Sequence, residues 1–338
     1  MRALVWKESG KVEHEADWPQ PGISDDEILV RVKAAGVCMT DIHMMRGTLD
    51  FANPPWVLGH EMSGVIEQTG KNTTGWKIGD RVIIDPVVTC GYCKHCLTGK
   101  KYLCASGGEL GTTYGSGGYG QYVSVKPSNL YLLPDELGFE EGAMMEPLNC
   151  TLGAIDRVSK MAGSHVLIFG PGPAGLLFVQ LAKAYGALSV TLVGMRDVNL
   201  SLGQQLGADY TVNITSASIE EALEGKEFDV VIEASGSVDG VQGCFTYVGR
   251  SGTVVLYGLN GSKKPSIDSD MIVAKDLTIV TCISAPLLWN KGIDLVKSGR
   301  VNVKDIITHL VPYAEAREFI NAIGDKSFST TKMVFTHE

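Results

Sequence analysis

The chain has 338 residues, with 29 Lys plus Arg against 38 Asp plus Glu, so its formal net charge is −9 with histidine neutral. This acidic balance argues against a nucleic-acid partner, because binding to a phosphate backbone depends on clustered Lys and Arg. Hydrophobic residues make up 44% of the chain and charged residues 20%, as in an ordinary globular protein with a buried core. At about 150 residues per domain, the length predicts two domains.

The first residues show no pattern of a secretion signal. Residues 1–7 form a short alternating strand pattern that runs into Glu8 and Lys11, without the apolar core of about 7–15 residues that such a signal has. The longest apolar stretch, 166–182, is interrupted by Gly and Pro and contains Gln180, which does not suit a membrane-spanning helix. We therefore expect a cytoplasmic protein without a membrane segment, in which closely spaced cysteines indicate metal binding or catalysis before disulfides.

Short alternating strands punctuated by glycine extend from residue 28 to about residue 125, for example at 28–32 and 81–84. Several strands at this spacing predict a small β-barrel or sandwich. The pattern changes after Glu146-Pro147, where 148–158 predicts a helix and 164–169 a wholly apolar strand. We place a domain boundary at this change.

The following segment alternates apolar strands with amphipathic helices, which indicates a parallel sheet covered on both faces. After about residue 285 a helix and short strands are expected to rejoin the first domain. The predicted domains are 1–148 with a cysteine-rich lobe at about 88–106, then 149–284, and a C-terminal segment 285–338. The predicted elements of the second half are strands 166–169, 190–193, 228–233, 253–257 and 333–335, and helices 174–185, 199–206 and 288–298.

Four cysteines form a C-x2-C-x2-C-x7-C pattern in a turn-rich segment: Cys90, Cys93, Cys96 and Cys104. Four thiolates at this spacing can bind one tetrahedral Zn²⁺. Chance clustering, two disulfides or an iron site are the alternatives; the expected reducing compartment opposes disulfides, and nothing else in the sequence indicates electron transfer. A site with four protein ligands is closed, so we expect a structural role.

A second group of metal-ligating residue types consists of Cys38, the adjacent pair His60-Glu61, and Glu146. A thiolate, an imidazole and a carboxylate would leave open the position that a catalytic zinc needs. Taken singly, each residue also has an ordinary structural interpretation, Cys38 as a small core residue and the others as hydrogen-bonded or surface side chains. The remaining cysteines, Cys150, Cys244 and Cys282, are expected to be buried thiols.

A glycine-rich turn, G-x-G-x-x-G, follows an apolar strand and opens a helix. In that context the first glycine makes the turn, the second lets a pyrophosphate approach the backbone, and the third lets helix and strand pack closely. The alternative is a tight turn in an α/β sheet that binds no nucleotide. The candidate coenzyme residues here are Gly170, Gly172, Pro173, Ala174 and Gly175, and those after the strand 228–233 are Ser235 and Gly236.

The end of the second strand is the place where an acidic residue would accept the ribose 2′-hydroxyl of NAD. The sequence has Gly194, Met195, Arg196 and Asp197 there. Gly194 leaves space for a 2′-phosphate and Arg196 can pair with it bidentately. Asp197 is the counter-evidence, either as a 2′-hydroxyl acceptor or as a partner of Arg196. The pattern favours NADP over NAD.

Together these motifs resemble the zinc-dependent medium-chain dehydrogenase/reductase superfamily, on its branch of polyol (sorbitol-type), threonine and secondary-alcohol dehydrogenases. The resemblance covers essentially the whole chain. It implies an α/β protein with a GroES-like β-barrel catalytic domain and a Rossmann coenzyme domain, and an active site in the cleft between them. The matching motifs, in the family's order, are G-H-E-x-x-G at 59–64, Gly-Asp-Arg-Val at 79–82, the four-cysteine lobe, Met-Glu-Pro-Leu at 145–148 and the glycine-rich turn.

The resemblance implies that Cys38, His60 and Glu61 bind a catalytic zinc. Glu146 matches a glutamate that in this branch either binds the zinc or holds its water. Thr40 matches the hydroxyl residue, and His43 the histidine, of the family's proton relay. That assignment agrees with the chemistry, because zinc lowers the pKa of an alcohol and His43 can pass on the proton near neutral pH. A turn residue and a surface histidine are the structural alternatives for Thr40 and His43.

Two departures from the sorbitol-type pattern concern specificity. Gly194 and Arg196 resemble the Gly-x-Arg of NADP-using secondary-alcohol members, whereas sorbitol-type members have Asp at the position of Gly194. Those members also carry an Arg-Tyr pair at the polyol site, where an ungapped comparison anchored at 301–303 places Ser284-Ala285. The missing pair weakens a sugar-alcohol assignment and leaves a smaller or less polar substrate open. The fold does not choose the substrate.

We therefore expect an alcohol dehydrogenase with two Zn²⁺ per chain, one catalytic and one structural, that converts a secondary alcohol, diol or polyol to the ketone or aldehyde with NADP. An L-threonine 3-dehydrogenase or a sugar dehydrogenase is the alternative within the superfamily. A non-catalytic nucleotide-binding structural or regulatory relative is the alternative of another class, and a zinc-free quinone reductase is contradicted by the cysteines. The resemblance suggests a homotetramer, with a dimer as the fallback.

Overall fold

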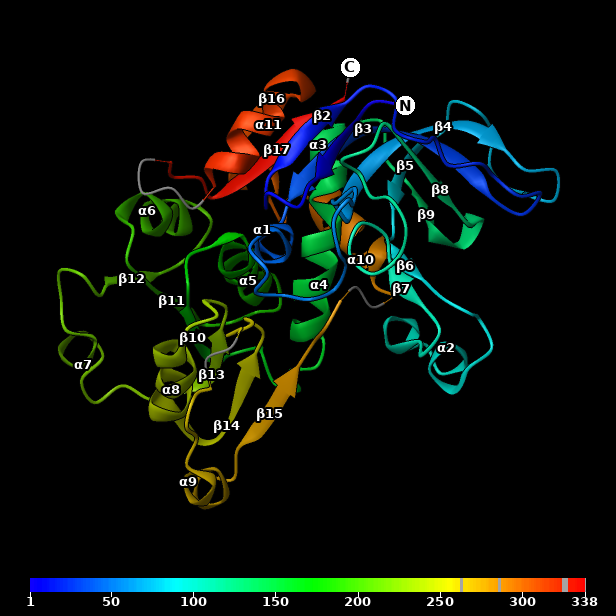
Figure 1. The fold of residues 1–338 in the computed structure, drawn as a ribbon. Coiled ribbons are helices and arrows are strands. Elements are labelled where there is room, and N and C mark those ends of the chain that lie inside the picture. Colours follow the sequence, from blue (N-terminus) through cyan, green and yellow to red (C-terminus); the bar gives the residue numbers. More distant parts are fainter. Residues whose placement is uncertain (262–263, 285–286, 324–327, 338) are drawn as a thin grey trace. The chain divides into compact units, whose positions relative to one another are not determined.

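The computed structural model describes residues 1–261, 264–284, 287–323 and 328–337, which form two compact units (Figure 1). The first unit comprises Met1–Pro147, Ser284–Ile293 and Ile307–Glu338, and the second comprises Leu148–Ile283 and Asp294–Ile306. No described helix is long and apolar enough to cross a membrane.

The first unit is built on a seven-stranded sheet of order β16-β17-β3-β4-β5-β9, with β8 paired to β3. Two small two-stranded sheets, β1-β2 and β6-β7, accompany it. The strands are β1 (Ala3–Trp6), β2 (Val12–Glu15), β3 (Ile28–Val37), β4 (Glu61–Thr69), β5 (Arg81–Ile84), β6 (Val87–Val88), β7 (Gly108–Glu109), β8 (Tyr122–Val125), β9 (Leu130–Leu132), β16 (Ile307–Pro312) and β17 (Lys332–Thr336). The helices are α1 (Met39–Met45), α2 (Lys94–Leu97), α3 (Phe139–Ala143) and α11 (Tyr313–Ala322), with short 3-10 turns at Lys101–Leu103 and Pro127–Asn129.

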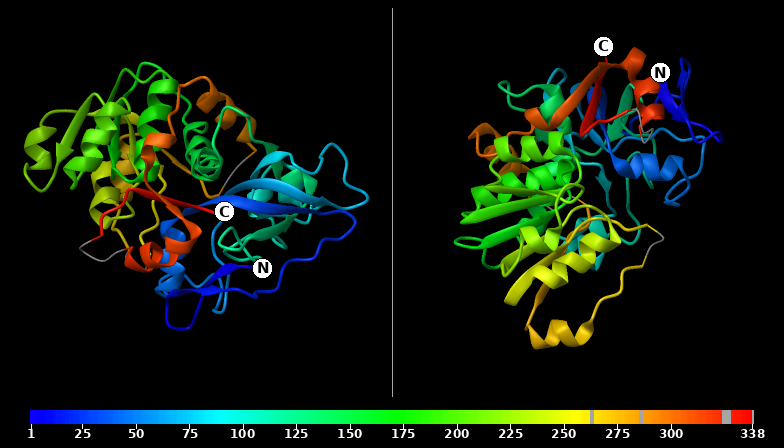
Figure 2. Two further views of the ribbon diagram at one scale, coloured as in Figure 1. Left: turned by 90° about the horizontal axis from the view of Figure 1, so that it is seen from above. Right: turned by 90° about the vertical axis from the view of Figure 1, so that its left-hand side faces the viewer.

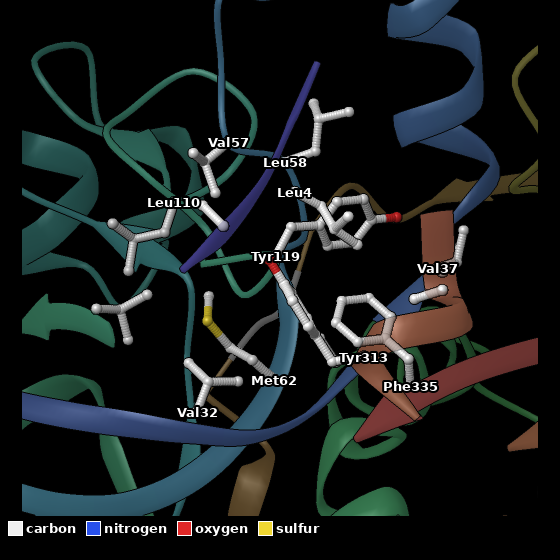
Figure 3. Close-up of a cluster of buried hydrophobic side chains, with 14 of the residues drawn as sticks. Leu4, Val32, Val37, Val57, Leu58, Met62, Leu110, Tyr119, Tyr313 and Phe335 are labelled. Atoms are coloured by element: carbon white, nitrogen blue, oxygen red, sulfur yellow. The ribbon is translucent and has the colours of Figure 1, made fainter. Parts of the chain in front are cut away.

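The core of this unit forms because its strands bury their apolar residues on a shared face. Tyr119 and Phe335 lie at its centre, both fully buried, with ring centroids 5.3 Å apart (Figure 3). Phe335 belongs to β17, which pairs antiparallel with β3. The C-terminal strand therefore completes the sheet that carries the N-terminal half of the chain.

The second unit is a six-stranded parallel sheet of order β12-β11-β10-β13-β14-β15. Because strand order reverses between β10 and β13, right-handed crossovers place α5 and α6 on one face and α8 on the other (Figure 2). Its strands are β10 (His165–Phe169), β11 (Ser189–Gly194), β12 (Tyr210–Asn213), β13 (Phe228–Glu233), β14 (Val248–Leu256) and β15 (Thr278–Thr281). Its helices are α5 (Pro173–Ala184), α6 (Asp197–Gln205), α7 (Ile219–Ala222), α8 (Val238–Tyr247) and α9 (Ser269–Ala274), with a 3-10 turn at Lys304–Ile306.

The predicted fold class, a GroES-like domain with a Rossmann sheet, is confirmed. The predicted elements of this unit did not include β12, β15, α7, α8 or α9, and the predicted strand 253–257 began five residues after the start of β14 at Val248. Two helices, α4 (Met145–Ile155) and α10 (Trp289–Lys297), contain the points where the two units divide.

The C-terminal segment divides differently from the prediction that all of 285–338 returns to the first domain. Residues 294–306 group with the second unit. One connection between this segment and α5 is made by Gln180, whose Nε2 donates to the Asn302 carbonyl at 3.0 Å while its Oε1 accepts from the Asn302 amide at 2.6 Å.

Candidate functional sites

The first site lies where β3 and β4 pair in the first unit. Cys38 follows β3, and Glu61 opens β4 opposite Gly36. One ligand atom from each of Cys38, His60 and Glu61 lies within 4.8 Å of the other two. A Cβ placed on Gly36 would lie 1.9 Å from Glu61 Oε2, so glycine at position 36 makes room for the carboxylate. The sequence motifs at 36–43 and 59–64 thus converge on one cluster.

His60 is held by Asp41, a residue that sequence analysis did not select. Asp41 is completely buried, and its Oδ1 lies 3.5 Å from His60 Nδ1. Burial lowers the His60 pKa, but the charges of Asp41 and Cys38 outweigh burial and raise that pKa well above 6.5. A carboxylate behind a metal-binding histidine is the arrangement that fixes the ring and strengthens its donor atom.

Asp41 also receives three further hydrogen bonds. The amide of Cys38 donates to its Oδ2 at 2.9 Å, the amide of Gly59 to its Oδ1 at 3.3 Å, and the Tyr119 hydroxyl to its Oδ2 at 3.3 Å. The amide of Cys38 and Asp41 lie three residues apart at the start of α1, the spacing at which a side chain caps a helix. That capping pattern was the sequence signal that could have identified Asp41.

Glu61 has a second buried partner, Lys332 of β17. Lys332 is 3% exposed, and its Nζ donates to Glu61 Oε1 at 2.6 Å and to the Val37 carbonyl at 3.0 Å. Burial lowers the Lys332 pKa, but the charges of Glu61, Cys38 and Asp41, together with the hydrogen bond to Glu61, outweigh burial and raise it. The cluster therefore carries a buried cation beside its carboxylate, which balances one of the negative charges.

Thr40 and His43 lie on α1, three residues apart and therefore on neighbouring positions of one helix face. Thr40 Oγ1 lies 3.5 Å from Cys38 Sγ, and His43 Nδ1 lies 3.0 Å from Thr48 Oγ1. Glu146 is buried in the first turn of α4 but is not one of the three residues whose ligand atoms converge. Thr40 thus contacts the cluster directly through Cys38, whereas His43 is linked to it only by lying on the same short helix as Thr40.

The second site is the four-cysteine lobe. Sγ–Sγ distances are 3.5 Å for Cys93–Cys96 and Cys90–Cys104, and 3.9 Å for Cys90–Cys96 and Cys93–Cys104. All four side chains are free thiols in the structure. The Cys96 backbone amide lowers the pKa of the Cys93 thiol to about 6, and the Cys90 amide lowers that of Cys104, whereas burial raises that of Cys96. Four converging sulfurs with amide donors are the donor set of a tetrahedral thiolate site.

The lobe is anchored by a buried ion pair between Lys101 and Asp85. Asp85 is fully buried. Burial is the main reason that its pKa is raised, although Lys101 opposes the shift. Cys150, Cys244 and Cys282, outside both clusters, are buried as predicted.

The third site is the glycine-rich turn between β10 and α5 in the second unit. Gly170 has φ +102° and its amide donates to the Val193 carbonyl at 2.9 Å. A Cβ on Gly175 would lie 1.8 Å from the Gly170 carbonyl oxygen, whereas a Cβ on Gly172 would meet nothing within 4 Å. Gly175 is therefore needed for packing, and Gly172, the N-cap of α5 before Pro173 and Ala174, faces open space where an anion can approach the amides.

Ser235 and Gly236 join this turn from the end of β13. A Cβ on Gly170 would lie 2.7 Å from Ser235 Cα. Their loop is organised by Glu233, which sequence analysis missed. Glu233 is completely buried; its Oε1 accepts from the Ser235 amide at 2.7 Å and the Gly236 amide at 2.9 Å, and its Oε2 accepts from the Gly258 amide at 3.1 Å.

The end of β11 carries the residues expected to select the coenzyme. Arg196 and Asp197 are exposed, at the start of α6. Asn213 of β12 donates to Asp197 Oδ1 at 2.5 Å. The Asp197 carboxylate is thus engaged by Asn213. Of the Ser284-Ala285 pair, Ser284 donates to Glu109 Oε1 at 3.2 Å, and Ala285 lies outside the described residues.

Two family models match the chain. The alcohol dehydrogenase GroES-like domain matches residues 24–135, and the zinc-binding dehydrogenase domain matches residues 173–298. Among curated proteins, sorbitol dehydrogenase of Bacillus subtilis is 30% identical over 91% of this chain and 89% of its own.

Among solved structures, a candidate zinc-binding dehydrogenase of Sinorhizobium meliloti 1021, bound to NADP, is 30% identical, with a TM-score of 0.92 over 99% of this chain and 98% of that one. A short chain alcohol dehydrogenase of E. coli CFT073, in complex with NADH, is 26% identical, with a TM-score of 0.91 over 99% of each chain. Both nicotinamide coenzymes therefore occur among proteins with this fold.

Proposed function

Because the chain belongs to the zinc-dependent alcohol dehydrogenases of the medium-chain dehydrogenase/reductase superfamily, we propose that it transfers a hydride between NADP and a secondary alcohol, diol or polyol at a zinc site formed by Cys38, His60 and Glu61. The observation that carries this proposal is the convergence of those three ligand atoms within 4.8 Å. The relative that acts on sorbitol supports the polyol end of this substrate range.

The cluster fits zinc on its own chemistry. A thiolate, an imidazole and a carboxylate are zinc donors, and three protein ligands leave a position for substrate. His60 Nδ1 faces Asp41, so Nε2 is the ring nitrogen left for a metal. Gly36 leaves room for the Glu61 carboxylate beside it. Zinc bound there would lower the pKa of the substrate hydroxyl. Glu146, buried at the start of α4, is proposed as the residue that binds the zinc or holds its water.

Proton removal falls to residues of α1. Thr40, next to Cys38, is proposed to accept the hydroxyl proton, and His43 to deliver it to solvent. Thr48 would hold the ring of His43 through its 3.0 Å contact with Nδ1. Asp41 and Lys332 act behind the ligands, since Asp41 orients His60 and Lys332 neutralises Glu61.

The coenzyme would lie along the carboxyl ends of the strands in the second unit, where strand order reverses. The open space at Gly172 supports a pyrophosphate there, and the loop of Ser235 and Gly236 is proposed to lie along the rest of the coenzyme. Preference for NADP is proposed on Arg196, which can pair with the 2′-phosphate, while Asn213 holds the carboxylate of Asp197.

A second, structural zinc is proposed in the four-cysteine lobe, held by Cys90, Cys93, Cys96 and Cys104. This site leaves no ligand position open, so it would stabilise the lobe rather than take part in the reaction. With four ligands in the lobe and three at the first site, the loaded protein would hold two zinc ions per chain. We propose a cytoplasmic location, because thiol ligands stay reduced in that compartment.

A homotetramer is proposed as the assembly, with a dimer as the smaller alternative. Strand β15 is an edge of the second unit's sheet, and its Ile279 is 41% exposed. An exposed apolar edge strand is a surface that a second copy can pair with. Light scattering coupled to size-exclusion chromatography measures the assembly directly.

Metal analysis and a substrate panel test the proposal. Purified protein should contain two zinc ions per chain, and NADPH should form with one class among alcohols, diols, polyols and threonine. Cys38→Ser should abolish turnover and lower zinc content to one ion, whereas Cys282→Ser, a buried thiol outside both clusters, should keep both. Full metal content and nucleotide binding without turnover of any panel member would favour the non-catalytic alternative.

The coenzyme preference has its own test. Comparing kcat/KM for NADP⁺ and NAD⁺ in the unmodified protein and in Arg196→Ala should show a preference for NADP⁺ that falls by about tenfold or more, since a charge-assisted contact to the phosphate is lost. A preference for NAD⁺ that the substitution leaves unchanged would refute the NADP assignment.

A further inference from the structure

The turn before α5 and the end of β11 meet at two residues, Pro171 and Gly194. A Cβ placed on Gly194 would lie 2.3 Å from Pro171 Cγ and 2.4 Å from Pro171 Cδ. Both atoms belong to the pyrrolidine ring, which is bonded to the backbone nitrogen and so cannot rotate aside. Any side chain at position 194 would therefore collide with Pro171.

Hydrogen bonds hold the backbone in place at both Gly194 and Pro171. Gly194 pairs with Asn213 of β12, and its carbonyl accepts from the Ile214 amide at 2.9 Å. On the other side, the side chain of Asn199, which is 2% exposed, donates to the Pro171 carbonyl at 2.7 Å. A shift large enough to admit a Cβ would cost hydrogen bonds on one side or the other.

Position 194 is the place where an acidic side chain would accept the 2′-hydroxyl of NAD. We propose that Pro171 is a specificity-determining residue, because it restricts position 194 to glycine and so excludes that acidic side chain. Pro171 thus requires glycine at position 194, and Arg196 is then the residue that contacts the 2′ group of the ribose. This inference rests on the coenzyme site of the proposed function and adds a residue to it.

Coenzyme binding tests the pair without any substrate. NADPH and NADH are titrated, by fluorescence, into full-length protein carrying Gly194→Asp, Pro171→Ala or both. Gly194→Asp alone should weaken binding of both nucleotides. Adding Pro171→Ala should recover NADH binding by about tenfold while NADPH stays weak. The matched control is Pro173→Ala with Gly194→Asp, since Pro173 lies in the same turn and should give no recovery.

A second measurement needs no nucleotide. Gly194→Ala adds only the colliding carbon, so it should lower the urea midpoint of unfolding in the Pro171 protein and have much less effect in the Pro171→Ala protein. Equal effects of Gly194→Ala in both proteins, or equal NADH binding by Gly194→Asp with proline and with alanine at 171, would overturn the inference.

Failure of the proposed function gives a different pattern. If the unmodified protein binds NADH more tightly than NADPH, the NADP preference is wrong and Pro171 has no role in maintaining it. If the unmodified protein prefers NADPH but the two substitutions act independently, the proposed function stands and only the role of Pro171 is overturned.

Discussion

His60 Nδ1 lies 3.5 Å from Oδ1 of Asp41, a carboxylate with no exposed surface. Asp41 also accepts hydrogen bonds from the amide of Cys38, itself a proposed zinc ligand, and from the amide of Gly59, which precedes the ligand His60. The buried Asp41 side chain therefore holds the backbone at Cys38 and next to His60, and it also orients the ring of His60. This contact explains how residues from two segments keep a common geometry.

Asp41→Asn should weaken zinc binding at the proposed catalytic site by about 10–100-fold, because the ring of His60 loses the charge that orients it and strengthens its donor atom. Competition with a chromogenic zinc chelator measures the affinity. Tyr119→Phe is the matched control, since it removes only the hydroxyl contact to Asp41 at 3.3 Å and should change the affinity much less. Equal affinities for Asp41→Asn and the unmodified protein would contradict the assignment.

Glu233→Gln should weaken NADPH binding by about tenfold, because an amide cannot accept all the hydrogen bonds that the carboxylate takes from Ser235, Gly236 and Gly258. The loop of Ser235 and Gly236 would lose its fixed position, so KM for the coenzyme should rise more than kcat falls. Glu227→Gln, an exposed carboxylate just before the same strand, is the control. A fall in kcat with unchanged coenzyme binding would count against this role.

Lys101→Met should destabilise the four-cysteine lobe by about 3 kcal/mol, because it leaves the buried carboxylate of Asp85 without its cation. Combining Lys101→Met with Asp85→Asn should restore most of that stability, since no uncompensated charge remains. The rate at which a chelator removes zinc from the lobe, together with urea unfolding, measures both variants. A double variant no more stable than Lys101→Met would show that the ion pair is not the cause.

His337 predicts a pH dependence of stability. It is 3% exposed, its Nε2 lies 2.9 Å from the Gly118 carbonyl, and burial lowers its pKa from 6.5 to about 4. Between those values the unfolded chain binds a proton that the folded chain does not, so this group contributes stability above pH 6.5 and loses it as the pH falls toward 4. The contribution is about 3 kcal/mol.

Unfolding by urea at pH 7 and near pH 4 measures this effect. Gln at position 337 can donate to the Gly118 carbonyl but does not titrate, so His337→Gln should lose less stability on acidification than the unmodified protein. His14→Gln is the control, because His14 is exposed and contacts the Ala314 carbonyl at 3.3 Å. An identical pH dependence in the His337→Gln and unmodified proteins would contradict the prediction.

The amino-acid sequence by itself determined the features that depend on nearby residues. Cys90, Cys93 and Cys96 are close in sequence, so tight local turns suffice to bring their three sulfurs together. The glycine-rich turn and the alternation of apolar strands with helices likewise predicted the parallel sheet and the coenzyme site, because turn chemistry and periodicity act over a few residues.

Only the tertiary structure decided which distant residues support those sites. Lys332 meets Glu61 because β17 pairs with β3, although 271 positions separate the two residues. Pro171 meets Gly194 because β10 and β11 are neighbours in the sheet. Such contacts follow from strand pairing and burial, where a charge must find a partner and a side chain must find space, and no local pattern records them.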